Sequence, residues 1–252
     1  MGDDFVQAGH GVRMEWGPEG AKRLAHEVTC LVVVDVLSFT TSVTVAVEAG
    51  TQVFPYRWRD ESAVGFAERV DAVLAVGRSA ATQASPWSLS PAALRRAPFV
   101  PRLVLPSPNG STIAAAAGDQ TPVLAASLRN ATAVGQWLGA QGHGSIDHPV
   151  GVIAAGERWP DGSLRPALED LLGAGAVIAA LLKFGGQAPS PEAAVAAAAF
   201  TGIPEPGAAV ASSSSGRELA AAGFADDVAV ATELDVSHVV PLLTDGAFVD
   251  VG

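Results

Sequence analysis

An acidic residue followed by hydroxyl groups is the stretch of this chain whose residue types most readily suggest chemistry. Asp35 ends the apolar run Leu31–Val34, which is typical of a strand buried on both faces of a parallel sheet. The hydroxyl residues that follow are Ser38, Thr40, Thr41 and Ser42. Ligands of open α/β sheets bind outside the carboxyl ends of strands, and helix starts attract anions. Two interpretations stay open: a ligand-binding turn, or helix capping by Asp35 and Thr40 alone.

The same order of strand, polar turn and helix recurs twice further along the chain. The segment Ser107–Thr112 follows the expected strand over 102–105, and Ser127–Thr132 follows the one over 122–126. Three strand ends would then present small polar groups to helix starts. This repetition predicts a shared polar pocket along one edge of the sheet.

Three further carboxylates stand at similar places. Glu157 comes just after the expected strand over 150–155, and Glu169 and Asp170 lie in the first turn of a long helix ending near 184. With Asp35, they could coordinate a metal ion through oxygen ligands. The alternative for the adjacent pair is complementarity with the helix dipole.

The elements that must position these residues alternate between strands and helices. This rhythm predicts one α/β domain over residues 1–252, layered αβα, with a largely parallel or mixed sheet. A division into two related lobes, about 12–145 and 149–252, is a further expectation. Residues 77–99 interrupt the rhythm with prolines and serines, and a long loop in a compact domain is often functional.

Composition narrows the classes of partner. The 252 residues carry a formal net charge of −11 and only two lysines, which disfavours nucleic acid. A small anionic ligand would need a local cluster of arginines, helix starts or a metal ion. Cys30 is the only cysteine, so no disulfide forms within the chain, in keeping with a cytoplasmic location. No apolar stretch is long enough for a membrane span, so no membrane partner is expected.

Several common catalytic motifs are missing from the sequence. No G-x-G-x-x-G follows a strand, no G-x-x-x-x-G-K-[ST] is present, and no G-x-S-x-G elbow occurs. Asp35 after an apolar strand is similar to the aspartate-nucleophile phosphatases. Their second aspartate, two positions later, is replaced here by Leu37, which argues against that class.

Seven segments spread over nearly the whole chain form a recognisable series. They are VVVDVLSFTTS around Asp35, SPNGST at Ser107–Thr112, ASLRNATAV at Ala126–Val134, VIAAGERW at Val152–Trp159, ALEDLLGAGAV at Ala167–Val177, SSGRELAAAGFADDV at Ser214–Val228, and the Asp235–Pro241 tail. In this order they resemble the 2-phosphosulfolactate phosphatase family. The resemblance implies a Mg²⁺-dependent phosphatase of a small 2-phospho-3-sulfo acid. It also implies an α/β fold particular to the family and a homo-oligomer.

The residue roles expected on this interpretation form three groups. Asp35 and Glu157 are the predicted catalytic residues, and Mg²⁺ would be held by Asp35, Glu157, Glu169 and Asp170. The predicted substrate-binding residues are Ser38, Thr40, Thr41, Arg78, Asn109, Gly110, Ser111, Thr112, Ser127, Asn130 and Arg217. Arg217 would pair with a second anion, supported by Arg78. A solvated surface arginine is the alternative for Arg217.

Two departures from the family pattern bear on the substrate. Ser38 stands where the family usually has an arginine, and the stretch 77–91 lacks the usual glutamate, aspartate and asparagine, although Arg78 and the Ser90–Pro91 pair remain. These changes remove charge and hydrogen-bond donors from a loop expected to shape the pocket. The rival interpretations are a different phosphorylated acid as substrate, or a non-catalytic protein that senses or binds a small anion on the same fold.

Overall fold

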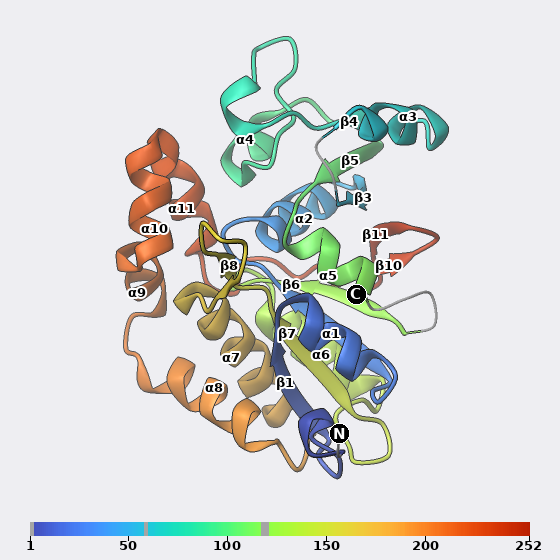
Figure 1. Cartoon of the computed structure of the whole chain (residues 1–252), viewed down its shortest axis with the longest axis vertical. Helices are drawn as coiled ribbons and strands as arrows, with labels where there is room; N and C mark the ends of the chain where they lie inside the picture. Colours follow the sequence, from blue (N-terminus) through green and yellow to red (C-terminus); the bar gives the residue numbers. More distant parts are fainter. Residues whose placement is uncertain (1–2, 58–59, 117–120) are drawn as a thin grey trace.

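The computed structural model describes residues 3–57, 60–116 and 121–252, and a nine-stranded mixed sheet runs through it (Figure 1). In spatial order its strands are β1 (Val12–Trp16), β7 (Val150–Ala154), β2 (Cys30–Val34), β6 (Val123–Ala126), β10 (Pro241–Thr244), β11 (Ala247–Asp250), β3 (Gln52–Tyr56), β5 (Arg102–Pro106) and β4 (Val73–Leu74). A separate two-stranded ribbon contains β8 (Glu157–Arg158) and β9 (Leu164–Arg165).

The large sheet consists of two parallel blocks joined by an antiparallel hairpin. Strands β1, β7, β2 and β6 are mutually parallel, and so are β3, β5 and β4. The hairpin β10–β11 pairs antiparallel with β6 on one side and β3 on the other. Since β7 follows residue 149 yet lies between β1 and β2, both predicted lobes contribute to one sheet. The division into lobes stays a prediction.

Eleven α-helices occur in the described residues. They are α1 (Gly17–Ala25), α2 (Phe39–Glu48), α3 (Glu61–Arg69), α4 (Pro91–Arg96), α5 (Gly110–Ala116), α6 (Ala131–Ala140), α7 (Leu168–Lys183), α8 (Pro191–Gly202), α9 (Pro206–Ser212), α10 (Ser214–Leu219) and α11 (Ala225–Ala231). Shorter helical turns are η1 (Asp3–Val6), η2 (Arg78–Ala80) and the π-type turn η3 (Ala220–Phe224). Hydroxyl and carboxylate caps start several helices, as with Ser90 before α4 and Ser190 before α8.

Two apolar cores, one on each face of the sheet, account for the layered arrangement. Successive residues of β2 point to opposite faces, so Val32 and Val34 pack with α6, α7 and α8, whereas Leu31 and Val33 pack with α1, α2 and α5. All five residues of β2 are buried. The predicted layered αβα fold with a mixed, mostly parallel sheet is confirmed.

Within the described ranges, no single helix combines the length and apolar character needed to cross a membrane. The helices α8 and α9 meet that requirement only as a pair bent by 99°. Much of α8 packs against the sheet core, where Ala193 and Ala196 are fully buried.

Candidate functional site

The turn between β2 and α2 holds Asp35 in a fixed orientation. One carboxylate oxygen accepts the Phe39 N–H at 3.1 Å, and the other accepts the Gly110 N–H at 2.9 Å. Gly110 is the first residue of α5, and a Cβ there would lie 2.2 Å from a ring atom of Phe39. Only glycine permits this approach, which brings the end of β5 to the end of β2. Burial raises the pKa of Asp35, while these two N–H groups and the Arg78 charge oppose the rise.

Asp170 joins two other strand ends. Its carboxylate oxygens accept the N–H of Val36 at 2.8 Å and the N–H of Gly156 at 2.8 Å, so α7 is tied to the turns after β2 and β7. Burial, followed by the charges of Asp35 and Glu169, raises the pKa of Asp170 well above its usual value. Asp170 therefore acts at least as a structural clamp for the loop that carries Glu157.

Glu157 lies on β8, just after the Gly156 turn, and is partly exposed to solvent. Its carboxylate accepts a hydrogen bond from the Asn109 side-chain amide at 3.2 Å. Burial first, and then the nearby charges of Asp35 and Glu169, raise the pKa of Glu157 to about 7. A carboxyl group with this pKa can give and take protons near neutral pH, as general acid–base catalysis requires.

Glu169 contributes a carboxylate oxygen without a partner. Its Oε2 accepts a hydrogen bond from the Ser213 hydroxyl at 3.3 Å, while the buried Oε1 accepts none from the described residues. The side chain is 1% exposed and acts electrostatically on Asp35, Glu157 and Asp170. All four predicted acidic residues are thus close enough to influence one another's charge.

Arg78 places a cation beside these carboxylates. Its guanidinium donates to the Ser38 hydroxyl at 2.5 Å and forms an ion pair with the buried Asp227 at 3.3 Å. The charges of Asp35 and Glu157 also act on it. Burial lowers the Arg78 pKa despite these carboxylates, although an arginine stays charged at neutral pH. Arg78 therefore supplies fixed positive charge to the turn after β2.

A cavity of about 310 Å³ opens beside Arg78 and Glu157, and we call it the arginine cavity. It is lined by Leu37, Arg78, Glu157, Arg158, Arg165, Ser215, Glu218, Leu219, Ala222 and Phe224. Arg165, which was not among the predicted binding residues, donates to the Ser215 hydroxyl at 3.2 Å and lowers the pKa of Glu157 by its charge. Trp159-Pro160-Asp161-Gly162 signals the turn before it, but not the direction of the arginine.

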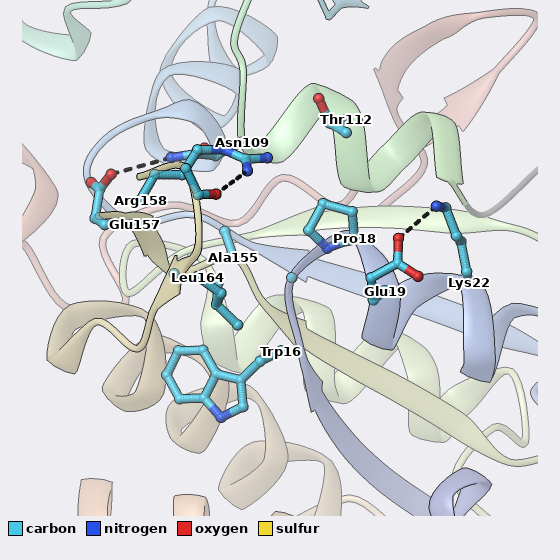
Figure 2. Close-up of a pocket in the computed structure, with 13 residues that line it drawn as sticks. Trp16, Pro18, Glu19, Lys22, Asn109, Thr112, Ala155, Glu157, Arg158 and Leu164 are labelled. Carbon is cyan, nitrogen blue, oxygen red and sulfur yellow. Dashed lines mark hydrogen bonds and ion pairs between the residues drawn. The ribbon is translucent and has the colours of Figure 1, made fainter. Parts of the chain in front are cut away.

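A second cavity, of about 420 Å³, lies beside the first, and we call it the Trp16 cavity (Figure 2). Its lining is Trp16, Gly17, Pro18, Glu19, Lys22, Asn109, Thr112, Ala155, Gly156, Glu157, Arg158, Gly162 and Leu164. Glu157 and Arg158 line both cavities. The predicted binding residues Asn109 and Thr112 therefore face this larger space.

Other predicted substrate-binding residues have local partners. The hydroxyls of Thr40 and Thr41 donate to the backbone carbonyls of Asp35 and Val36, each at 2.8 Å, and both side chains are fully buried. The buried Ser111 hydroxyl lies 3.5 Å from the Leu105 carbonyl. Their predicted contact with phosphate stays a prediction.

The third polar strand end, after β6, is also occupied by local contacts. The side-chain oxygen of Asn130 accepts the Ser127 N–H at 2.9 Å, and its side-chain NH₂ group donates to the backbone carbonyls of Ala125 and Val239. The Ser127 hydroxyl lies 3.5 Å from that of Thr44. Arg217 lies on α10 and is exposed to solvent, whereas Arg78 and Arg165 line the arginine cavity.

The acidic groups have a donor set that suits a hard divalent cation. Among the described residues, no group of three or more acidic, histidine or cysteine side chains is placed so that it could hold a metal ion. Magnesium usually binds through one or two carboxylates and completes its coordination with waters and substrate phosphate. The Oε1 of Glu169, which accepts no hydrogen bond from the described residues, is an oxygen donor of that kind.

This fold and site define an α/β protein with clustered carboxylates and arginines at converging strand ends. The family model described as 2-phosphosulpholactate phosphatase matches residues 18–246. A Deinococcus radiodurans protein named "Probable 2-phosphosulfolactate phosphatase" is 30% identical over 232 residues, covering 90% of this chain and 93% of the relative. The chain therefore belongs to the 2-phosphosulpholactate phosphatase family and is a phosphoric monoester hydrolase by that membership, as the sequence analysis predicted.

Proposed function

We propose that the protein hydrolyses the phosphate monoester of a small acid, 2-phosphosulfolactate or a close relative, to the hydroxy acid and phosphate. The observation that carries the proposal is the arginine cavity, which Arg78, Arg158 and Arg165 line together with Glu157. Arginines suit phosphate, carboxylate and sulfonate groups because their planar donors bind two oxygens at once. The name of the Deinococcus relative supports the same substrate class.

In this proposal Glu157 carries the proton. Hydrolysis forms a bond from a water oxygen to phosphorus, breaks the bond from phosphorus to the ester oxygen, and delivers a proton to that leaving oxygen. The attacking water loses one proton, which returns to the carboxylate of the acid and regenerates it. A Glu157 carboxyl with a pKa of about 7 holds such a proton in a substantial share of molecules at neutral pH. Asn109 keeps the carboxylate oriented through its 3.2 Å hydrogen bond.

Asp35 and Arg78 have complementary tasks. Asp35 is fixed by two backbone N–H groups, so its carboxylate is held in one orientation. Arg78 provides positive charge against the negative charge of the transferring phosphoryl group. Ser38, which accepts a hydrogen bond from Arg78, occupies the place of an arginine in the family pattern, so Arg78 carries the charge at this turn.

We also propose Mg²⁺ as the cofactor, held by Glu169 with Asp35 nearby, which leaves the Glu157 carboxyl free to hold its proton. When bound, Mg²⁺ would neutralise charge on the phosphoryl group. The buried Oε1 of Glu169, which lacks a partner among the described residues, supports this assignment. We expect Mg²⁺ to raise the unfolding temperature of the wild type, and the rise to be smaller in Glu169→Gln. An equal rise in both proteins would argue against a site at Glu169.

The test of function is phosphate release from 2-phosphosulfolactate, 2-phospholactate and phosphoglycolate, with Mg²⁺ and with EDTA. We expect metal-dependent turnover that falls at least a hundredfold in Asp35→Asn, since the amide removes a negative charge from the site. Asp147→Asn, in an exposed loop, is the matched control and should keep full activity. Folded protein that turns over none of these esters would refute the proposal. Thermal shifts with the same esters would then test the anion-binding alternative.

Two further proposals concern location and assembly. A cytoplasmic location is supported by the single cysteine, Cys30, which is free and fully buried. A homo-oligomer is proposed from the family resemblance alone, and sedimentation velocity would test it. Phosphorylated acid remains the proposed ligand, with neither nucleic acid nor membrane as a partner, given the net charge of −11.

A further inference from the structure

The larger cavity beside the proposed catalytic carboxylate has no task in the hydrolysis described above. The Trp16 cavity, about 420 Å³, exceeds the arginine cavity, about 310 Å³, although a small phosphorylated acid needs only the latter. Both volumes lie in or near the range of pockets that bind small molecules. The larger space is lined by residues from the start of α1 and from the β8–β9 ribbon (Figure 2).

The walls of this cavity are largely apolar. Trp16, Pro18, Ala155 and Leu164 supply an indole ring, a proline ring and aliphatic carbons. The charged pair at the rim, Glu19 and Lys22, is joined by a 2.6 Å ion pair, so neither charge needs a ligand. The interior therefore suits an apolar group and, beside the Trp16 indole, an aromatic ring in particular.

Glycines at special backbone positions allow this wall to form. Gly17 and Gly156 have φ values of +62° and +66°, and a Cβ on Gly156 would meet Leu164 Cδ1 at 2.8 Å and Trp16 Cε3 at 3.6 Å. A Cβ on Gly17 would lie 3.3 Å from Leu164 Cδ1. The side chains of Leu164 and Trp16 thus both pack close to Gly156, in the turn that leads to Glu157. The wall is tied directly to the element that carries the proposed acid.

The two cavities meet at the residues that would handle the phosphate ester. Glu157 and Arg158 line both, and Asn109 lines the Trp16 cavity while donating to Glu157. A substrate whose anionic groups contact Arg78 and Arg165 can therefore extend a substituent past Glu157 toward Trp16.

We propose that the Trp16 cavity binds an apolar, ring-sized side chain of the substrate, so that the preferred ester is a 2-phospho acid bearing an aromatic or branched substituent. This inference rests on the proposed phosphatase function and favours, among the relatives of 2-phosphosulfolactate, those in which an apolar group replaces the sulfonate. It agrees with the departures at Ser38 and in the 77–91 stretch, which remove charge and donors from the anion side. Apolar contacts to a ring give discrimination of about tenfold to a hundredfold against a methyl group.

The test compares two esters that differ only in this substituent, 2-phospho-3-phenyllactate and 2-phospholactate. We expect the phenyl ester to have a kcat/KM at least tenfold higher in the wild type. Leu164→Ser should bring that ratio close to one, because it removes an apolar wall. Leu168→Ser is the matched control, since Leu168 is 41% exposed and Leu164 is 40% exposed, and only Leu164 lines the cavity. The control should retain the wild-type ratio.

A binding measurement separates this proposal from the proposed catalysis. Calorimetric titration with 3-phenyllactate and with lactate requires no turnover, and the phenyl compound should bind at least tenfold more tightly to the wild type but not to Leu164→Ser. Turnover of both esters with equal kcat/KM would overturn the proposal while leaving the phosphatase function intact. Absence of turnover with selective binding of 3-phenyllactate would refute the phosphatase function alone. Equal binding of both acids, or selectivity that survives Leu164→Ser, would overturn the cavity assignment.

Discussion

At the scale of single residues, the site is a cluster of carboxylates with different tasks. Asp170 uses both oxygens to hold backbone N–H groups, and Asp35 does the same at the neighbouring turn. Glu157 makes one hydrogen bond and reaches solvent, so it can exchange protons. Glu169 has an oxygen that accepts no hydrogen bond from the described residues. Residues of similar chemistry are thus distinguished by which of their oxygens remain available.

The raised pKa of Glu157 predicts a pH dependence of stability in the absence of metal. The pKa is about 7 in the folded protein and near 4.5 when unfolded, so the folded state holds the extra proton between these values. The free energy of unfolding should therefore decrease as pH rises from about 4.5 to 7. In EDTA at pH 8, Glu157→Gln should be more stable than wild type by about 1 kcal/mol, a modest value because Glu157 is partly exposed.

Urea unfolding at pH 4 and pH 8 would measure this difference, which should nearly vanish at pH 4. The control is Glu68→Gln, because Glu68 is exposed on α3. It should change stability little, and equally at both pH values. A Glu157→Gln variant that is less stable than wild type at pH 8 would contradict the raised pKa.

The sequence identifies which residues meet, but not always what each one does. Asp35, Glu157 and the pair Glu169 and Asp170 follow strand ends or start a helix, and the structure brings them together because parallel strands share an edge. The direction of a side chain depends on contacts distant in sequence. The hydroxyls of Thr40 and Thr41 could equally face a ligand or their own turn, and in the structure they donate to that turn.

Among the secondary-structure elements, α4 and α11 together position Arg78. Asp227 of α11 accepts the Ser90 hydroxyl at 2.5 Å and the Ala92 N–H at 3.1 Å, and its other oxygen forms the ion pair with Arg78. The side chain is 1% exposed. Asp227 is therefore a positioning residue, because it acts on the proposed substrate only through Arg78. Asp226, its neighbour, is exposed and pairs with Arg96 at 3.4 Å.

Asp227→Asn should weaken substrate binding more than turnover. The amide keeps an oxygen that can accept from Ser90 but removes the charge facing Arg78. We expect KM for the phosphorylated acid to rise about tenfold, the scale of a lost charge-assisted contact, with kcat changed less. Asp226→Asn is the control and should leave both constants within twofold. The effect of Asp227→Asn should also diminish in an Arg78→Ala background, and full additivity in the double variant would refute the positioning role.

The sequence predicts the strand β2 and the start of α7 well, but it predicts the hairpin β10–β11 only if its turn residues are recognised. The apolar run of β2 and the first turn of α7 lie where periodicity places them. The hairpin β10–β11 near the C-terminus, by contrast, departs from the expected alternation of strands and helices. Its turn residues, Asp245 and Gly246, have φ of +52° and +81°, and Asp-Gly between apolar runs is a strong hairpin signal.

At the scale of the whole molecule, that hairpin joins two blocks whose strands run in opposite directions. Strand β11 reaches β3, and β10 reaches β6, so the sheet is continuous only through residues 241–250. Phe248 is fully buried and packs edge-on against Phe39, with ring centroids 6.3 Å apart. Since the Phe39 N–H also donates to Asp35, the junction between the blocks directly adjoins the site.

This arrangement predicts that the two blocks unfold together and that Phe248 is a principal contact between them. Phe248→Ala should lower the free energy of unfolding by about 3–5 kcal/mol, the usual cost of removing a buried ring. Val249→Ala, at the next and partly exposed position of the same strand, should cost about 1 kcal/mol or less. Urea unfolding followed by tryptophan fluorescence and by far-ultraviolet circular dichroism should give coincident transitions.

Two separated transitions in the wild type would show instead that the hairpin links units that unfold independently. Activity could then outlast the unfolding of the β3–β5–β4 block only if Gly110 stayed hydrogen-bonded to Asp35. Because that bond crosses from one block to the other, we expect activity and structure to be lost at the same urea concentration.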